Sequence, residues 1–147
     1  MEKIGLQKTN NMVTLEDVLV FRLKQLIETN GVLIPIEFDN TLPFKPKRTF
    51  FVTGVPDLSP RGKHAHHKTK QVLICLNGRI NVRLHDGFDE QIYILNSGDF
   101  IYIPNLIWDE QSYETPDTVL ISLCNTHYET SDYIHNFEDF LKIKNNG

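Results

Sequence analysis

Short apolar segments separated by turn-forming residues are the feature that most constrains the fold of this 147-residue chain. Glycine, proline and asparagine interrupt its middle roughly every ten residues, a spacing typical of all-β sandwiches and barrels. Several segments also alternate between apolar and polar residues, as a strand with one buried face does. We therefore predict a small antiparallel β-barrel with strands at 32–38, 48–55, 71–78, 79–87, 91–99, 100–105 and 118–125.

Two dipeptides in the middle of the chain predict tight turns. Asn77-Gly78 and Asp86-Gly87 are both sequences that favour two-residue hairpin loops. We expect the strands on either side of Asn77-Gly78 to pair as one hairpin, and Asp86-Gly87 to close a second.

Helix is expected only near the two ends. Apolar residues recur at three- and four-residue steps over 132–144, which predicts a short C-terminal helix with Asp132 as its N-cap. Residues 14–31 also have a helical pattern, with Thr14 three residues before Asp17 as a capping signal. A strand after residue 19 is the alternative for that stretch.

Length, charge and cysteine content fit a single cytoplasmic domain. Residues 1–147 form one domain in this interpretation, with 1–30 as an N-terminal extension. The net charge of -4 gives no basic footprint for nucleic acid or for a membrane surface. Cys75 and Cys124 lie in apolar runs and are expected to be reduced core thiols. No signal peptide or membrane-spanning run is recognisable.

The string RGKHAHHKTKQ, residues 61–71, holds three of the six histidines. On a strand His64 and His66 point to one face, about 7 Å apart at the usual rise, and His67 points to the other. Imidazole titrates near neutrality, so two converging rings suit proton transfer or metal binding. His67 is expected at the surface.

The spacing of these residues resembles the first motif of the cupin superfamily. That motif reads glycine, five residues, His-x-His, three or four residues, glutamate, six residues, glycine. Here His64 and His66 are followed by Gln71 in the glutamate position and by Gly78. The resemblance implies the cupin fold, a double-stranded β-helix or jelly roll.

The second cupin motif resembles GDFIYIPNLIWD, residues 98–109. Gly98 and Pro104 match it, whereas Leu106 stands in place of a glycine and Asp109 in place of a histidine. In metal-binding cupins the ligands are the two histidines, the glutamate and this last histidine, so two of the four are changed. A neutral amide is a poor substitute for a carboxylate at a divalent metal. We expect no metal and no cofactor; a His, His, Asp site is the alternative.

A longer series of strings resembles the cupin-fold sugar 3,4-ketoisomerases that act on dTDP-4-keto-6-deoxyglucose. These strings are RTFFVTGVP, PRGKHAHHKTKQVLICLNG, RLHDG, YIPNLIWDE and TSDYIHNFEDF, in that order. Phe50 and Phe51 stand where the family commonly has tyrosines. The resemblance implies conversion of dTDP-4-keto-6-deoxy-D-glucose to a 3-keto sugar, a homodimer often built with exchanged N-terminal strands, and a downstream pyridoxal-phosphate aminotransferase.

The resemblance also implies roles for individual residues. His64 is expected as the main base and His66 as its partner, with Arg61 and Gln71 at the substrate. Candidates for other contacts are Tyr102 as a proton donor, Trp108 as a stacking platform for thymine, and Arg48, Arg79 and Arg83 for the pyrophosphate. Asp109 is a candidate for orienting a histidine. The structural alternatives are core packing for Tyr102 and Trp108, and an ordinary rim carboxylate for Asp109.

Three other functions stay open. A 3,5-epimerase of the same substrate would also remove a proton next to the ketone. A metal-dependent cupin enzyme would use the His, His, Asp set. A binding protein would hold the nucleotide sugar without changing it, although it has little need of two titrating groups at one place.

Overall fold

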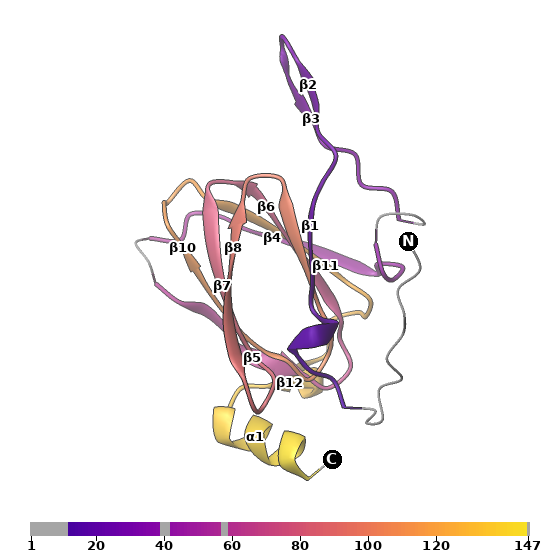
Figure 1. The fold of residues 1–147 in the computed structure, drawn as a ribbon, viewed down its shortest axis with the longest axis vertical. Coiled ribbons are helices and arrows are strands. Elements are labelled where there is room, and N and C mark those ends of the chain that lie inside the picture. Colours follow the sequence, from indigo (N-terminus) through magenta and orange to yellow (C-terminus); the bar gives the residue numbers. More distant parts are fainter. Residues whose placement is uncertain (1–11, 39–41, 57–58, 147) are drawn as a thin grey trace.

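The computed structural model describes residues 12–38, 42–56 and 59–146. Two antiparallel five-stranded sheets face each other around one core (Figure 1). One sheet has the order β1 (Leu19–Arg22), β9 (Asp99–Ile103), β6 (Gln71–Asn77), β11 (Val119–Cys124), β4 (Arg48–Val52). The other has the order β12 (Tyr133–Ile134), β5 (Arg61–His66), β10 (Trp108–Tyr113), β7 (Arg79–His85), β8 (Glu90–Asn96). The all-β prediction is confirmed, as a jelly-roll sandwich whose sheets do not close into a barrel.

The core follows from period-two alternation on facing strands. On β7, Ile80, Val82 and Leu84 are fully buried, and they pack against Leu73 and Ile101 of the opposite sheet. Burial of such side chains stabilises the fold by roughly 1.5–3 kcal/mol each. The alternation fixes which side chains of every strand enter the space between the sheets, and so decides which polar groups can form an interior site.

The expected hairpin at Asn77-Gly78 is wrong. β6 and β7 belong to different sheets, because β6 already pairs with β9 on one edge and β11 on the other. Gly78 has φ +83°, and the chain crosses there from one sheet to the other. The hairpin at Asp86-Gly87 is confirmed, with β7 and β8 in antiparallel register from Arg79↔Asn96 to His85↔Glu90.

The N-terminal helix reduces to a single turn. Thr14 and Asp17 form the predicted capping box around the 3-10 turn η1 (Leu15–Asp17), and the strand alternative holds after it. β-branched and aromatic residues favour a strand, and β1 pairs with the edge of β9. The strand predicted at 32–38 shortens to β3 (Gly31–Leu33), which forms a projecting hairpin with β2 (Leu26–Glu28).

The C-terminal helix begins later than predicted. Helix α1 (Phe137–Asn145) has Asn136 as its N-cap, whose side chain accepts from the amide of Asp139. Asp132 is not a cap: it ends the 3-10 turn η2 (Thr130–Asp132) and is buried. Strand β12 follows and pairs with the end of β5, Tyr133 opposite His66. The C-terminal segment therefore lies beside the histidine strand.

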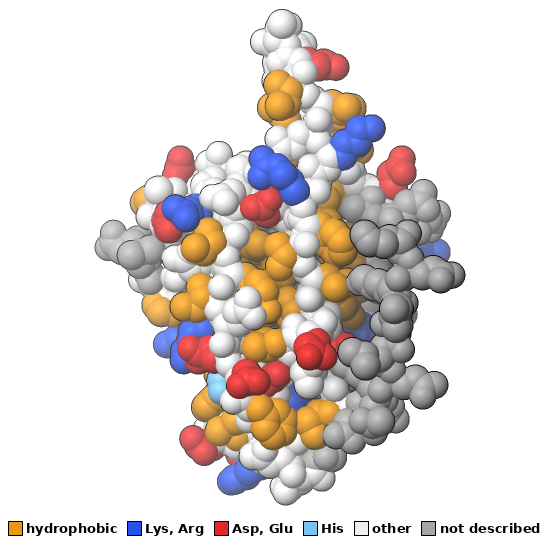
Figure 2. All heavy atoms as spheres, in the orientation of Figure 1, with side chains coloured by type: hydrophobic (Ala, Val, Ile, Leu, Met, Phe, Trp, Pro, Cys, Tyr) orange, Lys and Arg blue, Asp and Glu red, His pale blue; other side chains and the backbone are white. Residues whose placement is uncertain are grey.

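Exposed hydrophobic side chains are a prominent feature of the surface. Hydrophobic side chains gather on one face over β8 and β1 and along the β2–β3 hairpin (Figure 2). Those exposed there include Val20, Phe21, Ile27, Val32, Leu33, Ile92 and Ile94. Within the described residues, no helix has the length and apolar character needed to span a bilayer.

Gly62 marks the start of the histidine strand and gives a first prediction. It has φ +81°, and an added Cβ would lie 2.9 Å from the carbonyl oxygen of Asp109. Gly54 has φ +68° with no atom within 4 Å of such a Cβ. Gly54→Ala should cost about 1–2 kcal/mol of unfolding free energy for the left-handed backbone alone. Gly62→Ala should cost at least about 1 kcal/mol more, measured by urea denaturation. Equal losses would contradict the close approach.

Candidate active site

The site is built on the inner faces of β5 and β10. His64 is opposite Asp109 in the ladder between the two strands, so both side chains project to the same side of the sheet. Tyr113, at the other end of β10, is fully buried in the core between the sheets. The inner side therefore carries His64, His66, Asp109 and Gln111, as the parity of the histidines predicted. His67 is exposed, also as predicted.

His64 is held with one ring nitrogen towards the backbone. Its Nδ1 lies 3.0 Å from the carbonyl oxygen of Gly62. A carbonyl only accepts, so Nδ1 carries the proton and Nε2 keeps its lone pair. Burial, together with the neighbouring His66, lowers the pKa of His64 to about 4. The ring is consequently a neutral acceptor at neutral pH.

His66 is deeper and is held by a carboxylate. Its Nδ1 lies 2.9 Å from Oδ2 of Asp132, and only 5% of the residue is exposed. Burial lowers the pKa of His66 despite the opposing effect of Asp132. The two imidazoles meet edge to face with ring centroids 4.8 Å apart. Both rings thus use Nδ1 for anchoring and leave Nε2 for chemistry.

Asp132 is the functional residue that sequence reasoning misplaced as a helix cap. Its carboxylate accepts from the amide of Lys68 at 2.7 Å, from the Thr69 hydroxyl and from His66. Burial would raise the pKa of Asp132, but these hydrogen bonds outweigh it and hold the pKa below its ordinary value. The sequence signal for this role was the Asp-Tyr-Ile segment within TSDYIHNFEDF, one of the strings that resemble the family. The prediction of Asp132 as a helix N-cap assigned the residue a different role.

Arg48 reaches the histidines from the opposite sheet. It is aligned with Cys124 across β4 and β11, and Cys124 with Gln71 across β11 and β6, so all three share the inner face. The Arg48 guanidinium interacts with the side chains of Cys124 and Tyr133. The Tyr133 ring lies 4.5 Å from that of His66. A cation and a phenol therefore stand beside the paired imidazoles.

Three buried polar atoms of the described residues have no hydrogen-bond partner. They are Arg48 Nε, His66 Nε2 and Asp109 Oδ1, from strands β4, β5 and β10. Leaving a buried polar atom unpaired costs about 1–3 kcal/mol. Their concentration on the inner faces of three strands is what a site that receives a polar ligand would show.

Asp109 does not orient a histidine. Its Oδ2 accepts from Nε2 of Gln111 at 2.8 Å, and its Oδ1 is unpaired. Burial raises the pKa of Asp109 to about 7. Arg61 begins β5 opposite Gln111 and is exposed, with its charge felt by the hydroxyl of Tyr113. The carboxylate that hydrogen-bonds a histidine is Asp132 instead.

Three predicted residues are not brought to the histidines, because alternation places them on outer faces. Tyr102 lies beside Phe44, with ring centroids 6.2 Å apart, while Ile101 and Ile103 take the interior. Trp108 packs against α1, 5.2 Å from the ring of Phe137. The core alternative thus holds for Tyr102 and Trp108.

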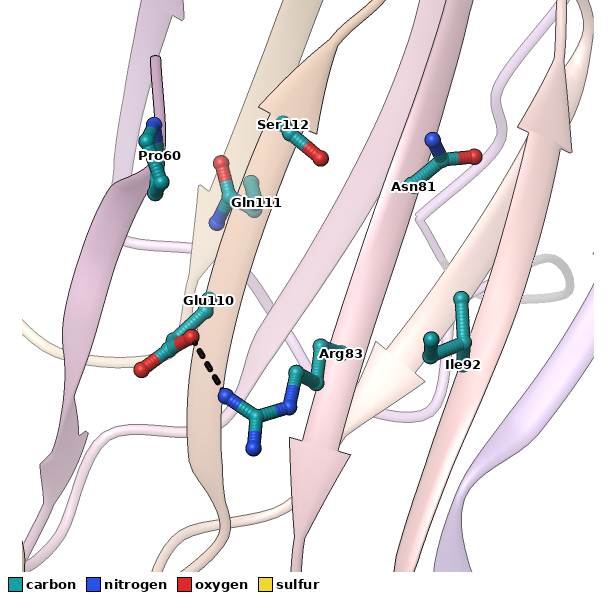
Figure 3. Close-up of a pocket in the computed structure, with 7 residues that line it drawn as sticks. All are labelled: Pro60, Asn81, Arg83, Ile92, Glu110, Gln111 and Ser112. Carbon is teal, nitrogen blue, oxygen red and sulfur yellow. Dashed lines mark hydrogen bonds and ion pairs between the residues drawn. The ribbon is translucent and has the colours of Figure 1, made fainter. Parts of the chain in front are cut away.

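Arg83 is the third of these residues. Its guanidinium lies 2.9 Å from Glu110 and 2.6 Å from Glu90. It lines a surface pocket of about 290 Å³ on the outer side of β7, β8 and β10, together with Asn81, Ile92 and Ser112 (Figure 3). Two carboxylates already occupy its donors, so this arginine is poorly placed for a pyrophosphate at the histidines.

Among the residues that the structure describes, no three His, Cys, Asp or Glu side chains are grouped as metal ligands would be. His64, His66 and Asp109 share a face, yet they do not form such a group.

The family expectation is confirmed by comparison with known proteins. A model of the family described as WxcM-like, C-terminal matches residues 16–145. The chain belongs to this family. The TDP-4-oxo-6-deoxy-alpha-D-glucose-3,4-oxoisomerase of Aneurinibacillus thermoaerophilus is 36% identical over 124 residues, which are 84% of this chain and 89% of the relative.

Solved structures of 3,4-ketoisomerases share the fold. QdtA, a sugar 3,4-ketoisomerase from Thermoanaerobacterium thermosaccharolyticum in complex with TDP, is 35% identical with a TM-score of 0.85, covering 90% of this chain and 98% of its own. A histidine-to-asparagine mutant of that enzyme, in complex with TDP-4-keto-6-deoxyglucose, is 34% identical with a TM-score of 0.85 over 90% and 97%. WlaRA, a TDP-fucose-3,4-ketoisomerase from Campylobacter jejuni, is 31% identical with a TM-score of 0.81 over 88% and 97%.

The role of Asp132 gives a prediction about stability. Asp132→Asn should lower the unfolding free energy at pH 7 by about 1–3 kcal/mol, because three donors lose their anionic acceptor. The pKa of Asp132 is lowered on folding, so its stabilisation is complete above the unfolded pKa of about 4 and is lost as the pH falls through the folded value. The gap between wild type and variant should therefore close on acidification.

Chemical denaturation from pH 3 to pH 8 measures this gap. Asp117→Asn, at an exposed position, is the matched control and should shift stability little. A gap that stays constant with pH, or one shared by the control, would contradict an anionic Asp132.

Proposed function

We propose that this protein is a sugar nucleotide 3,4-ketoisomerase that converts dTDP-4-keto-6-deoxy-D-glucose to the 3-keto isomer without a metal. The observation that carries the proposal is the pair of neutral imidazoles, His64 and His66, each anchored through Nδ1 with Nε2 left unbonded. Relatives at 34–36% identity are 3,4-ketoisomerases, and one of them holds this substrate, which supports the assignment.

The chemistry needs a base, a donor and an acid. The proton on C3 is acidified by the C4 ketone, because its removal gives an enolate. His64 is the proposed base: it is half-buried, so a sugar can reach Nε2, whereas His66 is buried beneath it. His66, fixed by Asp132, would then support His64 and the sugar oxygens. Either histidine in its charged form would be useless as a base, and burial keeps both neutral.

Arg48 is the proposed cation at the substrate. Among the strand arginines named from the sequence it is the one that faces the histidines, and its Nε is buried without a partner. Gln71, on the same inner face, is a further proposed contact. The exposed Tyr128 borders this cation, with its ring 5.6 Å from the Arg48 guanidinium. Arg61, opposite Gln111 at the start of β5, stays a proposed substrate contact. We assign no substrate contact to Tyr102, Trp108 or Arg83.

The place of the reaction in metabolism follows from its product. A 3-ketone is what a pyridoxal-phosphate aminotransferase needs to install a 3-amino group, so we propose such an enzyme as the next step, in the cytoplasm. The resulting 3-amino-3,6-dideoxy sugars would enter lipopolysaccharide or other glycans.

We also propose that the protein acts as a homodimer. The β2–β3 hairpin projects from the sandwich and exposes 77% of Ile27, 55% of Val32 and 58% of Leu33. An isolated two-stranded hairpin is at best marginally stable in water. The exposed apolar residues of its two strands would be stabilised by packing against a second copy of the chain, as the family expectation of an N-terminal interface suggests.

The activity is tested by NMR of dTDP-4-keto-6-deoxyglucose incubated with chelator-treated protein in D2O. Wild-type protein should give a 3-keto sugar carrying deuterium at C4, and His64→Asn should lower the rate at least about 100-fold because the base is lost. Lys63→Ala, an exposed neighbour, is the control. Deuterium at C3 and C5 of a sugar that stays a 4-ketone would indicate an epimerase. Activity that returns only when a divalent metal is added would indicate a metal-dependent enzyme. Binding of the sugar without any chemical change would indicate a binding protein.

The dimer is tested by light scattering after size exclusion. Wild-type protein should have twice the mass of the 17.1 kDa chain. The Ile27→Asp, Val32→Asp variant should shift to the monomer mass, since charge in a buried interface is costly. Phe88→Asp, equally exposed but in the β7–β8 turn, should remain dimeric. A monomeric wild type, or a dimeric hairpin variant, would contradict the proposal.

A further inference from the structure

A row of three hydrogen-bonded side chains runs along the inner face of β10 towards the histidines. The hydroxyl of Tyr113 donates to Oε1 of Gln111 at 2.7 Å, and Nε2 of Gln111 donates to Oδ2 of Asp109 at 2.8 Å. All three residues are buried. The donors all point towards Asp109, so Oδ2 is an acceptor and a carboxyl proton can sit only on Oδ1.

The surroundings of Asp109 favour the protonated carboxyl. Only 2% of the residue is exposed, and the apolar Leu84 of β7 faces it in the ladder. The charged or titratable groups around the row are His64 across on β5, Glu110 beside it, and, near Tyr113, Arg61 and Cys75. Burial and the charge of Glu110 raise the pKa of Asp109 to about 7, since neither stabilises an anion there.

Asp109 is also within reach of the reaction that His64 would serve. Side chains directly opposite on antiparallel strands have Cβ atoms about 4.5–5.5 Å apart. A sugar carbon at His64 Nε2 would bring its neighbouring oxygens towards the same inner face. Asp109 Oδ1 has no hydrogen-bond partner in the protein. An unpaired buried carboxyl oxygen lowers the stability of the fold, and an apolar side chain at this position would avoid that loss, so the carboxyl at this position calls for a functional explanation.

We propose that Asp109 enters the reaction as a neutral carboxylic acid and exchanges its Oδ1 proton with the oxygens of the bound sugar. This role rests on the proposed 3,4-ketoisomerase function. As His64 takes the C3 proton, the C3–H electrons form the C3–C4 double bond and O4 receives the Asp109 proton, giving a neutral enediol. Asp109 then takes the O3 proton while the His64 imidazolium protonates C4. Both groups return to their starting states and no external acid or base is used.

A residue that transfers a proton and a residue that only positions its neighbours respond differently to Asp109→Asn. Asparagine keeps the size of the side chain, an acceptor for Gln111 and a hydrogen-bond donor, but it cannot give up a proton at neutral pH. In D2O the variant should lose turnover at least about 100-fold. Exchange of the C3 hydrogen in recovered 4-keto substrate should fall by a similar factor, because Asp109 protonates O4 in the same step in which His64 takes the C3 proton. Ser112→Ala, on the outer face of the same strand, should match wild type.

The dependence of kcat on pH distinguishes the acid role from a purely structural role of Asp109, because structural damage to the site would not remove one ionisation from the profile. Wild-type kcat should fall as the pH rises through about 7, because the acid ionises, and this limb should be absent from the residual activity of Asp109→Asn. Turnover by Asp109→Asn within about threefold of wild type would overturn the acid role while leaving the ketoisomerase itself in place. Wild-type protein that leaves the sugar unchanged would overturn the proposed function, and this role with it.

A measurement on wild-type protein keeps the test independent of any variant. Carbon-13 NMR of the aspartate carboxyl carbons should show one group that titrates near pH 7 and is absent from Asp109→Asn. The unfolding free energy should also depend on this proton, because the native state binds it more tightly than the unfolded state does. The unfolding free energy of wild-type protein should therefore fall between about pH 4 and 7, and that of the variant should not. Complete ionisation of every aspartate below about pH 5 would overturn the proposal.

Discussion

The hydrogen bond between the Asp132 carboxylate and Nδ1 of His66 is the interaction on which the rest of the site depends. It joins the C-terminal segment to the histidine strand, and two backbone bonds reinforce the junction: the His67 amide donates to the Asp132 carbonyl, and the Leu106 amide to the His66 carbonyl. Strand β12 and the turn before β10 therefore meet at His66. A change in the C-terminal segment is felt at the imidazole, although the two lie 66 residues apart in the chain.

Burial has opposite chemical consequences for the bases and the acid of this interior. The same loss of solvation lowers the pKa of the imidazoles, which favours the neutral form that accepts a proton, and raises the pKa of the Asp109 carboxyl to about 7, which favours the form that donates one. Asp132 escapes this trend because three donors surround it. The same burial thus lowers the pKa of the bases and raises the pKa of the acid, which solvent exposure would not do.

Much of the fold could be predicted from the sequence, because alternation and turn residues mark the strands, and the residues that share one face of a strand such as β7 follow from local sequence alone. The crossing at Gly78 could not, since a two-residue turn signal does not say whether the next strand joins the same sheet. His64 and His66 could be predicted because their spacing is local in the sequence. The role of Asp132 could not, because it depends on a contact with His66 between distant parts of the chain. Tyr102 and Trp108 were misplaced because parity gives two faces without saying which one is inside.

Leu106 illustrates how the chain tolerates a departure from the cupin pattern. It occupies the place of a motif glycine with φ +59°, a conformation that costs a non-glycine residue roughly 1–2 kcal/mol. Its side chain packs against the cluster of Ala65, Trp108, Ile134 and Phe140, which offsets that strain. The glycine position is thus kept in backbone geometry, and the substitution adds contacts with the helix that covers the histidine strand.

The central claim is that both imidazoles are neutral, with the proton on Nδ1 and a free Nε2. Nitrogen-15 NMR of histidine-labelled protein at pH 7 tests it most directly, with resonances assigned through His64→Asn and His66→Asn variants. We expect both rings in the Nδ1–H form, and His64 to remain neutral down to about pH 4. An imidazolium at pH 7, or a proton on Nε2 of either ring, would contradict the account.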